Sequence, residues 1–147
     1  MITYVDTSAL LKLLVEEEGS EQVGLVWDVA DSLASVSLLV VEGRAALAAA
    51  ARAGRLTAAG HREAKSQLAD LVSQVAMIQV TEELVESAAD LTEEESLRGY
   101  DAIHLAGALT VDATVFASAD TALCAAAERR GLHIANPLEA GDDHRTS

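Results

Sequence analysis

The chain has 147 residues, half of them hydrophobic, one cysteine and a formal net charge of −14. This length fits a single domain around one core, and a lone cysteine excludes an internal disulfide and fits a reducing compartment. This negative net charge argues against nucleic-acid binding by bulk charge, and it favours a cationic partner or a bound divalent metal.

The N-terminus, M-I-T-Y-V-D, has no basic segment and reaches an acid at Asp6. This pattern predicts no signal peptide. The longest apolar run is interrupted by Glu42, Gly43 and Arg44, so no membrane-spanning helix is expected. We therefore expect a soluble protein of the cytoplasm.

Short apolar runs alternate with helical patterns along the chain. The expected strands are Ile2–Val5, Ser35–Val36, Met77–Val80, Ala113–Ser118 and Leu132–Ala135. The expected helices follow Asp6-Thr7-Ser8 and cover Glu21–Ala30 capped by Ser20, Val36–Gly54, Ala58–Val75 capped by Thr57, Glu82–Glu95 capped by Thr81, a segment opened by Asp101, and Asp120–Arg130. This alternation predicts an α/β fold, in which about five parallel strands are covered by helices on both faces. We expect one domain over residues 1–137, and a mobile tail over residues 138–147.

Glu42 is the most unusual residue of the chain. Helical spacing places it on one stripe with Leu38, Leu39, Ala45, Ala46 and Ala49. A buried carboxylate needs a partner, and Arg44 points elsewhere on a helix. We therefore expect a distant cation, a metal or other carboxylates sharing a metal to meet Glu42.

Three further acids stand at expected junctions of strands and helices. Asp6 follows the first strand, Asp120 follows the fourth, and Asp101 begins the helix that leads into the fourth. Each alone is explained by helix capping. If the first strand is central, however, all three converge with Glu42 at one end of the sheet, where sites form in such folds.

Clustered carboxylates repel one another unless a hard cation neutralises them, and Mg²⁺ or Mn²⁺ suits oxygen ligands. Such a centre activates water at a phosphodiester. The histidines show no zinc spacing. His104, three residues after Asp101, could approach the site, although a packed or surface position is the favoured interpretation. Ser8 could hold a metal-bound water or simply cap its local turn.

Five of the ten Lys and Arg residues lie between Arg44 and Lys65. They could form a local basic face, and solvated helix faces explain them equally well.

Four segments, V-D-T-S-A-L-L-K-L, L-L-V-V-E-G-R-A-A-L, Y-D-A-I-H-L-A-G-A-L and F-A-S-A-D-T-A-L, occur in this order. Together they resemble PIN-domain ribonucleases, and more narrowly the VapC toxins of bacterial toxin–antitoxin pairs, from Met1 to Pro137. The resemblance implies a central first strand, Mg²⁺ or Mn²⁺ held by acids, and cleavage of RNA, often structured RNA such as tRNA. It also implies homodimers and a cognate antitoxin.

Carried over by motif, Asp6 and Asp101 would be the principal metal ligands and catalytic residues, and Glu42 and Asp120 would complete the set. Thr121-Ala122-Leu123 departs from relatives that carry another acid or Asn there, so the number of ions stays open. Arg44 and Arg98 are the predicted phosphate contacts, together with Ser8 on the substrate side.

Two other families with clustered aspartates on a parallel sheet are disfavoured by the sequence. A response-regulator receiver domain needs a Lys after a late strand, and none follows Lys65. A haloacid-dehalogenase phosphatase usually has a second Asp two residues after the first, where this chain has Ser8. A PIN-like protein that binds a partner without cleaving RNA stays open.

Overall fold

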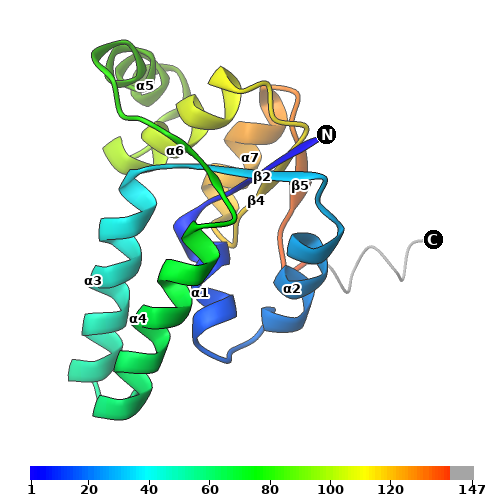
Figure 1. The fold of residues 1–147 in the computed structure, drawn as a ribbon. Helices are drawn as coiled ribbons and strands as arrows, with labels where there is room; N and C mark the ends of the chain where they lie inside the picture. The colour runs from blue at the N-terminus through cyan, green and yellow to red at the C-terminus, as the bar shows by residue number, and fades with distance from the viewer. Residues whose placement is uncertain (140–147) are drawn as a thin grey trace.

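The computed structural model describes residues 1–139 and has the predicted α/β architecture (Figure 1). The strands are β1 (Ile2–Val5), β2 (Ser32–Val36), β3 (Ala76–Ile78), β4 (Val115–Ala117) and β5 (His133–Ala135). The helices are α1 (Thr7–Leu14), α2 (Ser20–Val29), α3 (Leu38–Arg52), α4 (Ala58–Val72), α5 (Glu82–Glu95), α6 (Gly99–Thr110) and α7 (Thr121–Arg129). The predicted tail falls mostly on residues 140–147, which lie outside the described residues.

The five strands form one parallel sheet in the order β3-β2-β1-β4-β5. The first strand is therefore central, as predicted, with β2 on one side and β4 on the other. In the register of the sheet, Tyr4 of β1 is paired with Ala34 of β2 and with Phe116 of β4. The chain order reverses at β1, so the carboxyl ends of β1 and β4 frame the place where a site is expected.

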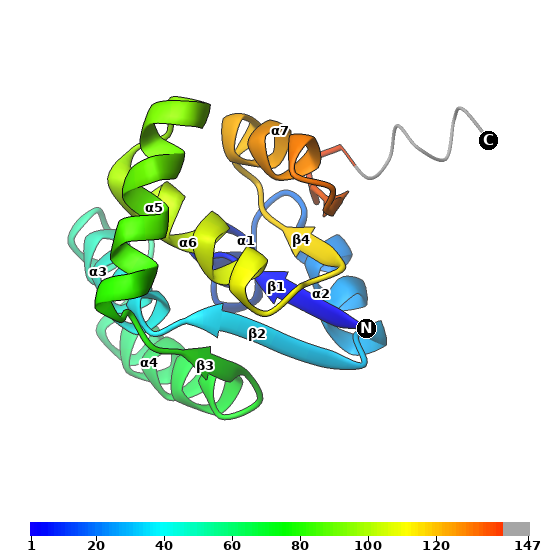
Figure 2. The ribbon, with the colours of Figure 1, turned by 90° about the horizontal axis from the view of Figure 1, so that it is seen from above.

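Each face of the sheet has its own apolar core. On one face, Tyr4 and Phe116 stack with ring centroids 5.4 Å apart beneath α5, α6 and α7. On the other, Val5 and Ala117 lie beneath α1, α2, α3 and α4. Successive strand residues point to opposite faces, which explains why neighbours in sequence enter different cores. Figure 2 shows the two helix layers on either side of the strands.

Gly107 allows α6 to lie directly on the sheet. A Cβ at this position would be 2.5 Å from Val36 Cγ1 and 3.3 Å from the Tyr4 ring. The absence of a side chain at Gly107 thus permits close packing of α6, which brings His104, one turn earlier, over β1.

Several sequence-predicted boundaries shift. Thr57 and Thr81 cap α4 and α5 as predicted, accepting bonds from Gly60 N and Leu84 N. The predicted cap at Ser20 is wrong: α2 begins at Ser20, and its hydroxyl accepts a bond from Glu17 N at 2.9 Å. The second strand also begins earlier than predicted, because β1 pairs with it from Ser32 onward.

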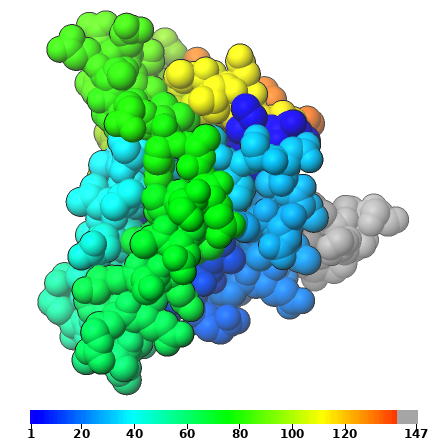
Figure 3. Space-filling model, viewed as in Figure 1, coloured from blue at the N-terminus to red at the C-terminus, as the bar shows by residue number. Residues whose placement is uncertain are grey.

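Helices α3 and α4 form a hairpin that packs against the sheet layer at one end, and its other end projects from the protein as a lobe (Figure 3). Gly54, at φ +77°, ends the first helix in the left-handed conformation that glycine favours. Within residues 1–139, no helix combines the length and the apolar character needed to cross a bilayer.

Candidate active site

The sheet topology gathers the predicted acids at the carboxyl ends of β1 and β4. Asp6 directly follows β1 and caps α1, and Asp120 caps α7 shortly after β4. Asp101 lies in the first turn of α6, and Glu42 in the second turn of α3. The four side chains do not form one cluster: Asp6 and Glu42 have separate polar partners, whereas Asp101 and Asp120 share one.

Asp6 is the most enclosed of these acids, with an exposed fraction of 4%. Its Oδ1 accepts bonds from the Ser8 hydroxyl (2.7 Å) and Ala9 N–H (3.0 Å), and its Oδ2 accepts one from the Ser118 hydroxyl (2.6 Å). Burial nevertheless raises the pKa of Asp6, and the nearby His104 and the three hydrogen bonds only partly offset this. The ionised carboxylate thus lies in a place that lacks a full counter-charge.

Two serines fix Asp6 by joining the ends of β1 and β4. Ser8 Oγ accepts a bond from Ala119 N–H at 2.9 Å, and Ser118 Oγ accepts one from Asp120 N–H at 3.0 Å. Ser8 therefore orients Asp6 and the loop after β4, a structural use of the residue predicted to face the substrate. Sequence reasoning missed Ser118, although the segment S-A-D places it two residues before a predicted site acid.

Glu42 lies beside the buried stripe of α3, not on it. The buried residues are Leu39, Gly43, Leu47 and Ala50, whereas Ala45 and Ala49 of the predicted stripe are exposed. The Glu42 side chain is 23% exposed. The predicted stripe was wrong because the packing surface of α3 runs along i, i+4, i+8 and i+11, so Glu42 stands at its edge, facing the site.

The expected distant partner of Glu42 is His104. Its Nε2 lies 2.6 Å from Glu42 Oε1, which also accepts a bond from the Thr7 hydroxyl at 2.7 Å. Burial raises the pKa of Glu42, but the bonds from His104 and Thr7 outweigh it, so the pKa of Glu42 is lowered. Interpreting His104 as a packed or surface residue was incomplete, and neither His104 nor Thr7 was recognised as a partner.

Tyr4 holds His104 from its other side. The Tyr4 hydroxyl lies 2.8 Å from His104 Nδ1 and accepts a weaker bond from Val36 N–H at 3.3 Å. Burial raises the pKa of Tyr4, so this hydroxyl keeps its proton. Because the Glu42 carboxylate can only accept, Nε2 of His104 donates to it, and in this tautomer of the neutral ring Nδ1 accepts from the Tyr4 hydroxyl. A chain of polar contacts thus runs from the centre of the sheet to the site.

Arg98 links the remaining two acids. Its Nε lies 3.1 Å from Asp101 Oδ2, and one terminal nitrogen lies 3.8 Å from Asp120 Oδ2. Its guanidinium also lies over the Tyr100 ring at 5.1 Å. Asp101 was predicted to open α6, but the helix begins at Gly99 after Arg98, so Asp101 has its own place inside the first turn. Arg98 is 68% exposed and supplies the positive charge between these carboxylates.

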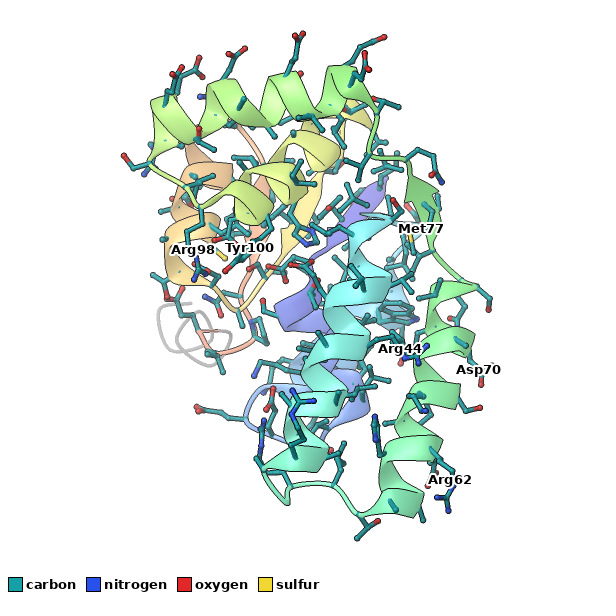
Figure 4. The ribbon with its side chains drawn as sticks, turned by 90° about the vertical axis from the view of Figure 1, so that its left-hand side faces the viewer. Arg44, Arg62, Asp70, Met77, Arg98 and Tyr100 are labelled. Carbon is teal, nitrogen blue, oxygen red and sulfur yellow. The ribbon has the colours of Figure 1, made fainter. Side chains whose placement is uncertain are left out.

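Arg44 does not join the site. It is exposed on α3, and its side chain points toward α4, whereas Arg98 and Tyr100 lie on the other side of α3 (Figure 4). The structure therefore brings one of the two predicted phosphate contacts to the acids and leaves the other on the hairpin.

The donor chemistry of the acids fits a hard divalent ion. Asp6, Asp101 and Asp120 offer carboxylate oxygens at the end of the sheet, and Mg²⁺ and Mn²⁺ prefer such ligands. Within residues 1–139, no three His, Cys, Asp or Glu side chains lie close enough together to hold an ion as they stand. The buried charge of Asp6 and the arginine drawn to Asp101 and Asp120 both mark a place that attracts a cation.

The chain is similar to known proteins over most of its length. The family described as "PIN domain" matches residues 3–129. Ribonuclease VapC45 and Ribonuclease VapC49, from two strains of Mycobacterium tuberculosis, are each 39% identical over 110 residues, which is 75% of this chain and 76% of the relative.

Solved structures share the fold. PAE2754 from Pyrobaculum aerophilum matches with a TM-score of 0.71 at 22% identity, covering 98% of this chain and 88% of that one. A toxin–antitoxin complex from Klebsiella pneumoniae matches with a TM-score of 0.61 at 18% identity, covering 81% and 87%. At these identities the likeness concerns the fold alone.

Proposed function

Because the chain belongs to the PIN domain family and, within it, to the VapC-type toxins, we propose that it is a metal-dependent endoribonuclease. It acts in the cytoplasm as the toxin of a toxin–antitoxin pair. The observation that carries the proposal is the group of acids at the ends of β1 and β4, where Asp6 is buried without a full counter-charge and Asp101 and Asp120 share one guanidinium. The names of the relatives support ribonuclease activity and an antitoxin partner.

In the proposed mechanism, Asp6, Asp101 and Asp120 would hold Mg²⁺ or Mn²⁺ through their carboxylate oxygens, and Glu42 would complete the set. A bound ion would supply activation of water and neutralisation of charge at the phosphodiester. Glu42 stays ionised because His104 and Thr7 both donate to its Oε1. Ser8 and Ser118 fix the direction of the Asp6 carboxylate by a hydrogen bond to each of its oxygens.

Arg98 has two roles in this proposal. In this structure it neutralises Asp101 and Asp120, and its exposed guanidinium would be free to contact a phosphate of the RNA if a bound ion supplied that charge instead. Arginine suits this second role because its planar fork of donors matches a phosphate group.

The test is RNA cleavage by the purified protein, with tRNA as one substrate, in EDTA and in millimolar Mg²⁺ or Mn²⁺. Asp6→Asn and Asp101→Asn should reduce cleavage to background while the protein stays folded. Asp112→Asn is the matched control: it makes the same chemical change at an exposed residue with φ 52°, a conformation that Asn tolerates, at the far end of α6.

Two outcomes would contradict the proposal. Cleavage that persists in EDTA, or that both site variants retain, would exclude a metal centre at these acids. If the wild type bound RNA or an antitoxin but cleaved nothing with either ion, the protein would be a binding module with a PIN fold. The mass of the purified protein in solution tests the accompanying proposal of a homodimer.

A further inference from the structure

The α3–α4 hairpin carries a concentration of positive charge that the rest of the chain lacks. Residues 38–72 of the hairpin contain five Lys and Arg residues and three acids (Glu42, Glu63 and Asp70), whereas the chain as a whole has 24 acids against 10 such cations. The cations, called here the hairpin cations, are Arg44, Arg52, Arg55, Arg62 and Lys65.

The pairing of the cations differs sharply between the hairpin and the remainder. Within residues 1–139, every Lys and Arg outside the hairpin lies in an ion pair: Lys12 with Glu17, Arg98 with Asp101, and Arg129 and Arg130 with Glu95. Within the same residues, no hairpin cation lies in an ion pair, although acids outnumber cations across the chain.

The hairpin cations are also available to a large partner. All except Lys65, which is partly buried, are exposed, and they lie along a lobe that projects from the body of the protein (Figure 3). Arg44 leaves α3 on the side of α4, and Arg62 leaves α4 near the tip of the lobe (Figure 4).

The lobe begins at the candidate active site. Glu42 lies in the second turn of α3 and Arg52 at its end, so ten residues of helix separate them by about 15 Å. Phosphates along one strand of double-stranded DNA are about 3.4 Å apart along the axis. A helix of this length therefore matches about four nucleotides of a nucleic-acid strand.

We propose that the hairpin cations form a binding surface for the phosphate backbone of RNA along α3 and α4, from the α4 side of α3, where Arg44 lies, to the tip of the lobe. This inference rests on the proposed function, and it explains how a chain with a net charge of −14 retains a polyanionic substrate. We expect this surface to bind RNA without sequence preference, because contacts to phosphates carry no sequence information.

The test compares three variants, each with three substitutions. In Arg52→Gln/Arg55→Gln/Arg62→Gln, three hairpin charges are removed; in Arg52→Lys/Arg55→Lys/Arg62→Lys, they are kept. In Gln79→Glu/Ser87→Glu/Ala89→Glu, the net charge falls by the same amount at exposed positions before and within α5. Binding to a labelled single-stranded RNA and a labelled hairpin RNA is measured without divalent metal over a range of salt concentrations.

The Gln variant should bind RNA about tenfold or more weakly at low salt, and the slope of log affinity against log salt should fall by about 2. The Lys variant and the acidic control should keep the wild-type slope. Equal weakening in the Gln variant and the acidic control would attribute binding to bulk charge and overturn the proposal, as would no weakening in the Gln variant. If poly-glutamate bound through these cations and RNA did not, the surface would belong to an acidic protein partner.

Failure here is separate from failure of the proposed function. If the wild type cleaved RNA with metal while the Gln variant bound RNA normally, only the binding surface would be refuted. If RNA binding depended on the hairpin cations but no cleavage occurred with Mg²⁺ or Mn²⁺, the surface would stand without the nuclease.

Discussion

The hydroxyl of Tyr4 supports the site from the middle of the sheet, and Tyr4→Phe removes this one atom. The Tyr4 side chain is fully buried, and its ring stacks on Phe116, a contact that Phe would keep. The change therefore isolates the polar contacts of the hydroxyl from the packing of the ring.

The expected cost follows from the groups left without a partner. His104 Nδ1 is 2.8 Å from the hydroxyl, and the His104 side chain is 3% exposed, so water cannot replace the lost donor. A buried polar group without a partner costs about 1–3 kcal/mol, and the longer bond from Val36 N–H contributes about 1 kcal/mol more. We expect a loss of about 2–4 kcal/mol in the free energy of unfolding, or roughly 8–15 °C in melting temperature.

Urea unfolding of the wild type and the variant measures this difference, and the slope with denaturant should not change. Tyr100→Phe is the control, because Tyr100 is 48% exposed and its hydroxyl makes no hydrogen bond within residues 1–139. A Tyr4→Phe variant within about 0.5 kcal/mol of the wild type would refute the reasoning, as would an equal loss in Tyr100→Phe.

Three further predictions concern the packing and charge around the site. Gly107→Ala should lower the free energy of unfolding by about 1–3 kcal/mol, since its Cβ would lie 2.5 Å from Val36 Cγ1; unchanged urea stability would mean that α6 moves away freely. Asp6→Asn should unfold at higher urea than the wild type at pH 7 without divalent metal, because burial raises the pKa of Asp6 in the folded protein. Its advantage should vanish below about pH 4, where unfolded aspartate is also protonated, and a less stable variant at pH 7 would show that the hydrogen bonds outweigh burial. Arg98→Gln should lower the Mn²⁺ concentration needed for half-maximal thermal stabilisation, because the ion no longer displaces the guanidinium from Asp101; an unchanged concentration would remove Arg98 from competition with metal.

The order of elements could be predicted from the sequence because its signals are local. Apolar runs alternate with capped helices, and Thr57, Thr81 and Asp120 cap where they were expected to. The errors also have local causes. Ser20 and Asp101 are good capping residues, but neither is the cap. Helix α2 begins at Ser20 itself, after Gly19, and α6 begins at Gly99, after Arg98.

The partners within the site could not be predicted from the sequence in the same way. His104 meets Glu42 across 62 residues, and Ser118 meets Asp6 across 112. Only the order of the strands brings these pairs together, and the pattern of one segment contains no information about the other. The burial of Glu42 was predicted from an ideal helix, whereas the packing of α3 on the sheet turned that residue to the edge of its stripe.

The central position of β1 has a consequence during protein synthesis. Tyr4 and Val5 are synthesised more than a hundred residues before their β4 neighbours, Phe116 and Ala117. At about 5–20 residues per second, the growing chain waits for several seconds with one side of its central strand unpaired. Asp6 cannot meet Ser118 until then, so on the proposed function the buried acid of the site acquires its hydrogen-bond partner only after β4 has been synthesised.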